Sequence, residues 1–182
     1  MPSRFSRFLA ELKRRKVYHV AVAYVAVGFA LVEFRRQYEK DSENPNWVAW
    51  YALALAYDHE AETAAELIEP IATAHPDKPH AILAAMQIRA LRGDREGFLR
   101  KLDGPLHDWF RERVWATRVA AAFALLDERE EALNWLEHAV NCGFIHYPLF
   151  SEKDPWLESI RGEERFQDLM ARVRHEWESF EV

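Results

Sequence analysis

The side chains of this sequence that could do chemistry are eight histidines, two groups of carboxylates and one cysteine. No pair of histidines has the His-Glu-x-x-His spacing with which one helix face binds zinc, and two prolines separate His75 from His80. The carboxylates of 58–62 and 127–131 fall where helices are expected to begin, and negative charge there interacts favourably with the helix dipole. We therefore predict no metal site, and we interpret both carboxylate groups as structural rather than as acid–base pairs.

Nucleophiles and phosphate-binding loops are equally sparse. Cys142 is the only cysteine, which excludes an intramolecular disulfide, and we expect it to pack as a small apolar side chain near a helix end. Gly93 and Gly97 fall at an expected turn rather than in a phosphate loop, and no Gly-x-Ser-x-Gly nucleophile elbow occurs. The sequence therefore predicts a non-catalytic protein with no catalytic residue, no cofactor and no small-molecule substrate.

Charge is divided unequally along the sequence. Residues 1–40 carry nine Lys or Arg and three Asp or Glu, a net charge of +6. Residues 41–182 carry 15 Lys or Arg and 27 Asp or Glu, a net charge of −12. Proteins that bind nucleic acid need a basic face to displace counterions. The acidic larger part argues against nucleic acid as a partner, and the contrast divides the chain into two regions at residue 40.

An almost uncharged run at 17–34 follows the basic cluster 13–16. As a helix it would be about 27 Å long, close to the roughly 30 Å hydrocarbon core of a bilayer. Basic residues before such a run favour an N-terminus inside the cell. The sequence predicts a long apolar N-terminal helix that anchors the chain in a membrane, and a fully buried first helix is the alternative. The residues assigned to the anchor are Val17, Val20, Val22, Val25, Val27, Phe29 and Leu31.

The region 41–182 has apolar residues at helical spacing between breaks that contain Pro or Gly, and no strand-like alternation. Helices are expected over 47–57, 60–75, 79–91, 96–102, 108–126, 128–141 and 162–180. In the first of them, Trp50, Leu53, Ala54 and Tyr57 share one stripe. The breaks recur at a period of a little over 30 residues, which is typical of stacked helical hairpins. The predicted fold is all-α: a short right-handed α-solenoid of helical hairpins with a C-terminal capping helix.

Small and large apolar residues alternate between 119 and 140 at the offsets that let two antiparallel helices interlock. These residues, at the separations typical of the tetratricopeptide repeat, are Phe123, Ala132, Leu136 and Ala139. The segment resembles that family, whose repeats bind other proteins. Two departures stand out. Tyr57 to Ala64 is two residues shorter than the consensus turn, and Gly97-Phe98 stands where alanine is expected, which predicts a loosely packed second hairpin.

The string at 131–166 resembles the closing segment of bacterial multidomain proteins with tetratricopeptide tails, which often follow a protein kinase, an adenylate cyclase or a winged-helix regulator. The stretch 11–18 and the apolar run after it are similar to the membrane-anchoring start of the same group. The resemblances cover about 45–182 and 5–32. They imply attachment to a bacterial inner membrane, with a cytoplasmic location as the alternative. No effector domain lies between the two parts, so we expect a shortened member.

The function expected on these grounds is a membrane-tethered interaction module that binds a short segment of an unidentified protein partner in a small groove. We expect Tyr51 and Leu55 in the first hairpin, with Thr117, Ala121 and Leu125 in the third, to line that groove. One alternative is a regulatory tail that acts in trans on a signalling enzyme. Another is a structural or vestigial product of a larger tetratricopeptide protein.

Overall fold

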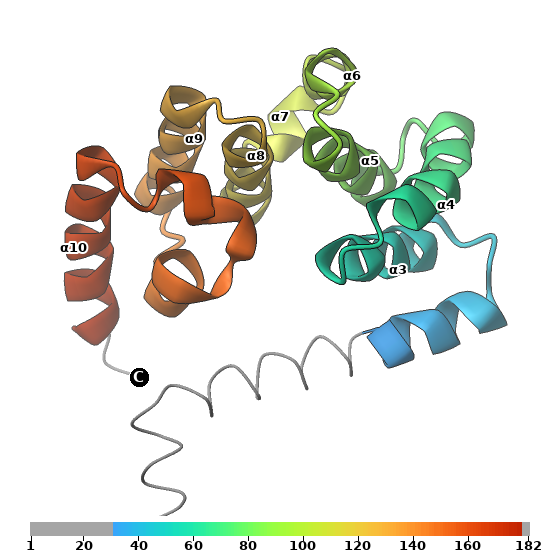
Figure 1. Cartoon of the computed structure of the whole chain (residues 1–182), viewed down its shortest axis with the longest axis horizontal. Helices are drawn as coiled ribbons and strands as arrows, with labels where there is room; N and C mark the ends of the chain where they lie inside the picture. Colours follow the sequence, from blue (N-terminus) through green and yellow to red (C-terminus); the bar gives the residue numbers. More distant parts are fainter. Residues whose placement is uncertain (1–30, 180–182) are drawn as a thin grey trace, which may run out of the picture.

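The computed structural model of the chain describes residues 31–179, and all regular secondary structure in this range is helical (Figure 1). The all-α prediction is confirmed for these residues. A first helix covers 31–40. The elements after it are α3 (Pro45–Tyr57), α4 (Ala61–Ala74), α5 (Pro79–Leu91), α6 (Arg95–Leu102), α7 (His107–Phe110), α8 (Arg113–Leu125), α9 (Arg129–Asn141), the π-helical turn η1 (Leu149–Lys153), the 3-10 helix η2 (Pro155–Ile160) and α10 (Glu164–Glu178).

Three helix pairs, α3/α4, α5/α6 and α8/α9, turn in the same way at a fixed interval. Each turn has a left-handed residue, at His59 (φ 68°), Gly93 (φ 76°) and Asp127 (φ 57°), and these positions follow one another every 34 residues. The same backbone hydrogen bond closes each turn, from Glu60 N to Leu55 O (2.9 Å), from Asp94 N to Arg89 O (2.9 Å) and from Glu128 N to Phe123 O (3.0 Å). The three turns are therefore structurally equivalent.

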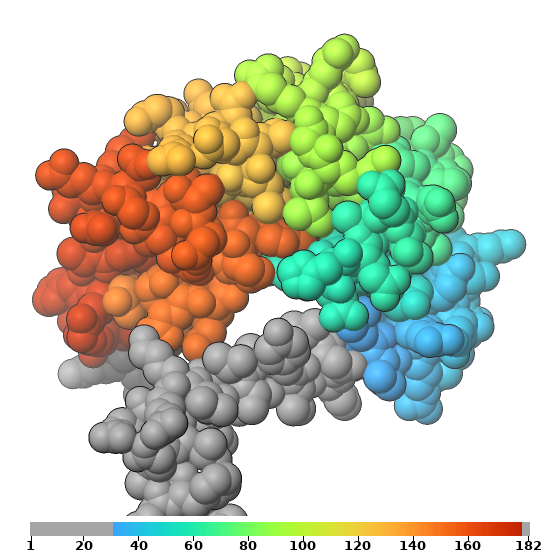
Figure 2. All heavy atoms as spheres, viewed as in Figure 1, coloured from blue at the N-terminus to red at the C-terminus, as the bar shows by residue number. Residues whose placement is uncertain are grey.

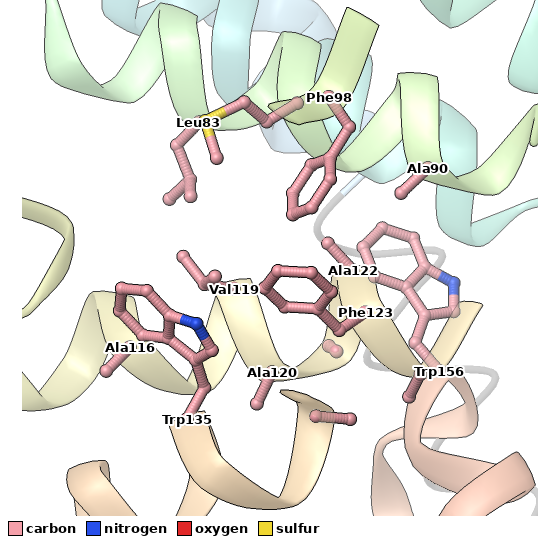
Figure 3. Packing of buried hydrophobic residues seen from close by; sticks show 14 of the residues in the cluster. Leu83, Ala90, Phe98, Ala116, Val119, Ala120, Ala122, Phe123, Trp135 and Trp156 are labelled. Atoms are coloured by element: carbon pink, nitrogen blue, oxygen red, sulfur yellow. The ribbon is translucent and has the colours of Figure 1, made fainter. Parts of the chain in front are cut away.

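This equivalence corrects two interpretations of the sequence. Leu55, and not Tyr57, is the equivalent of Phe123, so the first turn is not shortened. Phe98 stands where the third pair has Ala132, yet its side chain is fully buried and its ring lies edge-on to Phe123 at 4.9 Å between centroids (Figure 3). The larger residue therefore fills space against the next pair, and the prediction of loose packing is wrong.

The first helices of the three pairs pack side by side. α5 lies against both α3 and α8. α4, α6 and α9 each pack on their own partner, and α4 also packs on α5. Figure 1 shows the pairs following one another along an arc, with α10 at the far end. Small residues let the helix axes approach closely, and fully buried alanines accordingly occur in every pair, at Ala52, Ala64, Ala84, Ala120 and Ala132.

The last helix, α10, packs through the face that the sequence predicts. Phe166, Leu169, Met170 and Val173 are all buried, whereas Trp177 is 41% exposed. Most of the predicted apolar stripe is therefore covered. Trp177, at the end of that stripe, keeps a large part of its ring on the surface.

At the other end, the helix at 31–40 packs against α3. Leu31 and Tyr38 contact the core, and charged side chains such as Arg35 and Arg36 are exposed. None of the helices within 31–179 has the length and apolar character needed to cross a bilayer. Except for Leu31, the residues assigned to a membrane anchor lie outside the described part of the chain.

Candidate binding groove

A cavity of about 180 Å³ lies on the side of the α3–α5–α8 row that α4, α6 and α9 leave free. Its wall is mostly apolar and comes from four helices. The residues that line it, here called the inner groove, are Phe34, Trp50, Leu53, Ala54, Tyr57, Leu83, Gln87, Trp115 and Arg118. Because each helix of the row contributes, the cavity exists only when the pairs are packed together.

Five aromatic rings, here called the aromatic row, run along one edge of this groove. Successive centroids are 6.0 Å apart from Phe34 to Trp50, 5.7 Å from Trp50 to His80, 5.1 Å from His80 to Trp115 and 4.6 Å from Trp115 to Trp109. All five side chains are partly exposed. Burial among the indoles lowers the pKa of His80 below its usual value, which favours the neutral imidazole. The row thus presents a continuous, uncharged aromatic surface.

A hydrogen-bonded triad forms the polar end of the groove. The Arg118 guanidinium donates to the Tyr57 hydroxyl at 2.7 Å and to the Asp154 carboxylate at 3.3 Å. The Tyr57 hydroxyl lies 3.4 Å from the other Asp154 oxygen, which also accepts from Trp156 N at 3.1 Å. Burial raises the pKa of the Tyr57 hydroxyl above its usual value, against the opposing effect of Arg118. Because Asp154 is only 6% exposed, the charge of Arg118 is balanced from inside the protein.

Gln87 is a buried polar residue in an otherwise apolar part of the wall. Its Nε2 donates to the Arg118 carbonyl at 3.3 Å, and the side chain is 1% exposed. Among the described residues no donor reaches its Oε1. The amide hydrogen bond connects α5 to α8 directly and helps to fix the distance between these two helices.

Two of the predicted groove residues, Tyr51 and Leu55, belong to α3 but do not line the cavity. Tyr51 stacks on Tyr38 with 5.3 Å between centroids, and Leu55 is 6% exposed in the core. The physical reason is that Leu55 occupies the place of Phe123, which packs between helices. The open face of α3 instead carries Trp50.

Two of the three predicted groove residues of the third pair are covered. Ala121 follows Gln87 by one 34-residue interval, but it is fully buried because α8 has η2 packed against it. Thr117 is 7% exposed, and its hydroxyl donates to the Val114 carbonyl of its own helix at 2.6 Å. Leu125 is partly buried against the core. Thr117 and Ala121 therefore do not face an open groove, whereas the side chain of Leu125 stays partly exposed.

The residues that do line the groove carried a recognisable signal. The stripe of Trp50, Leu53, Ala54 and Tyr57 recognised in the sequence is the wall contributed by α3. A helix that already packs through Val48, Ala52 and Ala56 does not need a second apolar stripe for its own stability. Such an additional stripe, rich in aromatic residues, marks a surface left for another element.

Residues that could hold a metal do not gather within 31–179: no three His, Cys, Asp or Glu side chains come together there. Cys142 is at the end of α9, as predicted, but it is exposed rather than packed. Its sulfur lies 3.7 Å from His138 Nε2. Searches of protein-family models, curated proteins and solved structures found nothing that matches this chain.

Proposed function

We propose that this protein is a non-catalytic interaction module that binds a short apolar segment of a protein partner in the inner groove. The observation that carries the proposal is the aromatic row, because it stays partly exposed along the edge of an apolar cavity. Trp is enriched among the residues that dominate binding energy at protein interfaces. Three of the five rings, those of Phe34, Trp50 and Trp115, also line the cavity.

The size of the cavity favours a side chain over a metabolite. Sites for small molecules usually enclose about 300–1,000 Å³, and this cavity has about 180 Å³. One or two apolar side chains of a bound segment would fill it. The rest of such a segment would lie along the aromatic row, and Arg118 and Tyr57 at the polar end would set its register.

We propose further that the fold is a short right-handed α-solenoid of the tetratricopeptide type. Supporting this assignment are the three equivalent turns at intervals of 34 residues, the period of that repeat. In such a stack, the first helices of the pairs form the inner surface, which agrees with the helices that contribute to the groove. The proposed tether to a bacterial inner membrane through 17–34 rests on the sequence alone.

Peptide display against the full-length protein tests the proposal. We expect selected peptides to carry a large apolar residue and to lose about tenfold or more in affinity when Trp50 and Trp115 are both changed to alanine. The matched control is Trp177→Ala, which removes an exposed indole on α10, away from the groove. Circular dichroism checks that both variants stay folded. Equal peptide affinity in the double variant and in the control would contradict the proposal.

A further inference from the structure

We propose that the inner groove of the free protein is occupied by the chain's own apolar segment, residues 17–30, which competes there with the partner. The inference rests on the proposed function, because it assigns a regulation to the same groove. The helix at 31–40 connects this segment to the groove.

The helix at 31–40 turns one face toward the groove. Phe34 lines the cavity and stacks on Trp50 at 6.0 Å between centroids. Leu31 and Tyr38 lie on the same side and contact the core. Val32, on the other side, is 68% exposed. The helix is thus oriented with a defined apolar stripe on the groove side.

Positions before residue 31 continue this stripe in the sequence. At 3.6 residues per turn, positions 30, 27, 23 and 20 fall within about 40° of Phe34 around a helix. These positions are Ala30, Val27, Ala23 and Val20, and no charged residue occurs from 17 to 32. A helix that kept the register of 31–40 would therefore present small apolar side chains to the cavity.

The length of the segment fits this occupant, and the charge of the residues that precede it favours the same association. Fourteen residues of helix are about 21 Å long, and three helices packed 8–10 Å apart make a row about 20 Å wide. Residues 1–30 carry six Lys or Arg and one Asp or Glu, a balance of +5, against −12 in 41–182. Opposite charge on the two parts favours their association.

Docking of the segment has a functional consequence. A partner reaches the groove only in the fraction of molecules from which the segment has left, so its apparent affinity falls by that fraction. A membrane would also take up this apolar segment, and the groove would then be free. Partner binding would in this way depend on attachment to the membrane.

Photocrosslinking of the full-length protein tests the docked state. Benzoylphenylalanine replaces Val27, on the stripe, or Val25, which would lie on the opposite side if the register of 31–40 continues and is therefore the matched control. In lipid-free buffer we expect irradiation at position 27 to give an intramolecular product with α5 or α8, and position 25 to give several-fold less. Equal yields from both positions, or no product with α5 or α8, would overturn the proposal. A product between two chains would overturn it in favour of a second copy.

Irradiation of the same benzoylphenylalanine variants bound to phosphatidylglycerol vesicles tests whether the membrane competes with the groove for the segment. We expect the product at position 27 to shift from the protein to lipid, because the segment cannot occupy both places. If the groove product persists on vesicles, the docked state stands and the tether is wrong. If position 27 reacts with lipid on vesicles and never with α5 or α8 in buffer, the segment is only an anchor and the inference fails.

Peptide affinity separates this inference from the proposed function. Val27→Asp places a charge on the stripe and should raise the affinity of a selected peptide about tenfold by freeing the groove, whereas Val25→Asp should not. If peptides bind but Val27→Asp has no effect, the inference fails and the proposed function stands. If the crosslink forms but no peptide binds even Val27→Asp, the proposed function fails and the docked segment remains.

Discussion

The indole ring of Trp156 lies parallel to the phenol ring of Tyr57, with centroids 3.9 Å apart and 3° between the planes. The two residues belong to η2 and α3, so this contact connects the first helix pair to the segment before α10. Figure 2 shows the same relationship on the surface, where the orange C-terminal residues lie beside the first helix pair. The groove is thus bounded at its polar end by residues far apart in the sequence.

Removal of the Asp154 carboxylate should loosen this contact. We expect Asp154→Ala to lower the free energy of unfolding by about 2 kcal/mol, because Arg118 and the backbone N–H of Trp156 both lose a buried acceptor. Urea denaturation measures the change. Glu158→Ala is the control: its carboxylate pairs with Arg161 at the surface, and its loss should cost less than about 0.5 kcal/mol. A similar loss in both variants would contradict the role given to Asp154.

Stability at alkaline pH should depend on Tyr57. Burial raises the pKa of its hydroxyl in the folded protein, whereas in the unfolded chain the pKa is about 10. Above pH 10 the unfolded chain therefore loses this proton first, and the free energy of unfolding falls as the pH rises. We expect urea denaturation between pH 9 and 11.5 to show a steeper fall for the unmodified protein than for Tyr57→Phe. Equal slopes would show that the hydroxyl titrates alike in both states.

His80 should produce the opposite dependence at mildly acid pH. Its pKa is lowered in the folded protein, so the unfolded chain takes up the proton first, near pH 6.5. The free energy of unfolding therefore falls as the pH drops from 6.5 and levels off below the folded pKa. His80→Phe keeps a ring in the aromatic row and removes this component. Urea denaturation midpoints measured from pH 7.5 to 5 test this. An equal fall of the midpoint in both proteins would contradict the burial of a neutral imidazole.

The sequence is informative about the helices because local patterns determine them. α3 begins at Pro45, two residues before the expected start at 47, and the local residue types explain the start. The Asn44 side chain accepts from Asn46 N at 3.1 Å, and Pro45 lies at a helix position whose N–H has no partner. The 34-residue separation of Gly93 and Asp127 was also visible, because left-handed turn residues have a recognisable composition.

The faces that α5 and α8 turn to the groove could not be obtained in this way. Ala121 is apolar and occupies the place of Gln87, but whether that place is open depends on η2, which comes much later in the chain. Likewise, the separation of Arg118 from Asp154 and Tyr57 along the sequence hides their contact. Long-range packing of this kind leaves no periodic signal, so the groove residues outside α3 had to come from the structure.

The three left-handed turn residues allow the conformational strain of one backbone position to be measured. Gly93 has φ 76°, and a Cβ added there would meet no atom within 4 Å. We expect Gly93→Ala to destabilise the protein by about 1 kcal/mol through backbone strain alone, since L-residues are disfavoured in this region. Gly162→Ala is the matched control, because its Cβ also meets nothing but its φ is ordinary. This variant should be neutral or slightly stabilising.

The reverse changes, His59→Gly and Asp127→Gly, relieve the same strain at equivalent positions. Glycine also raises the entropy of the unfolded chain, which opposes the gain in stability. Urea denaturation of the four variants measures the balance, and an equal effect of alanine at 93 and 162 would contradict the assignment of strain to the turn.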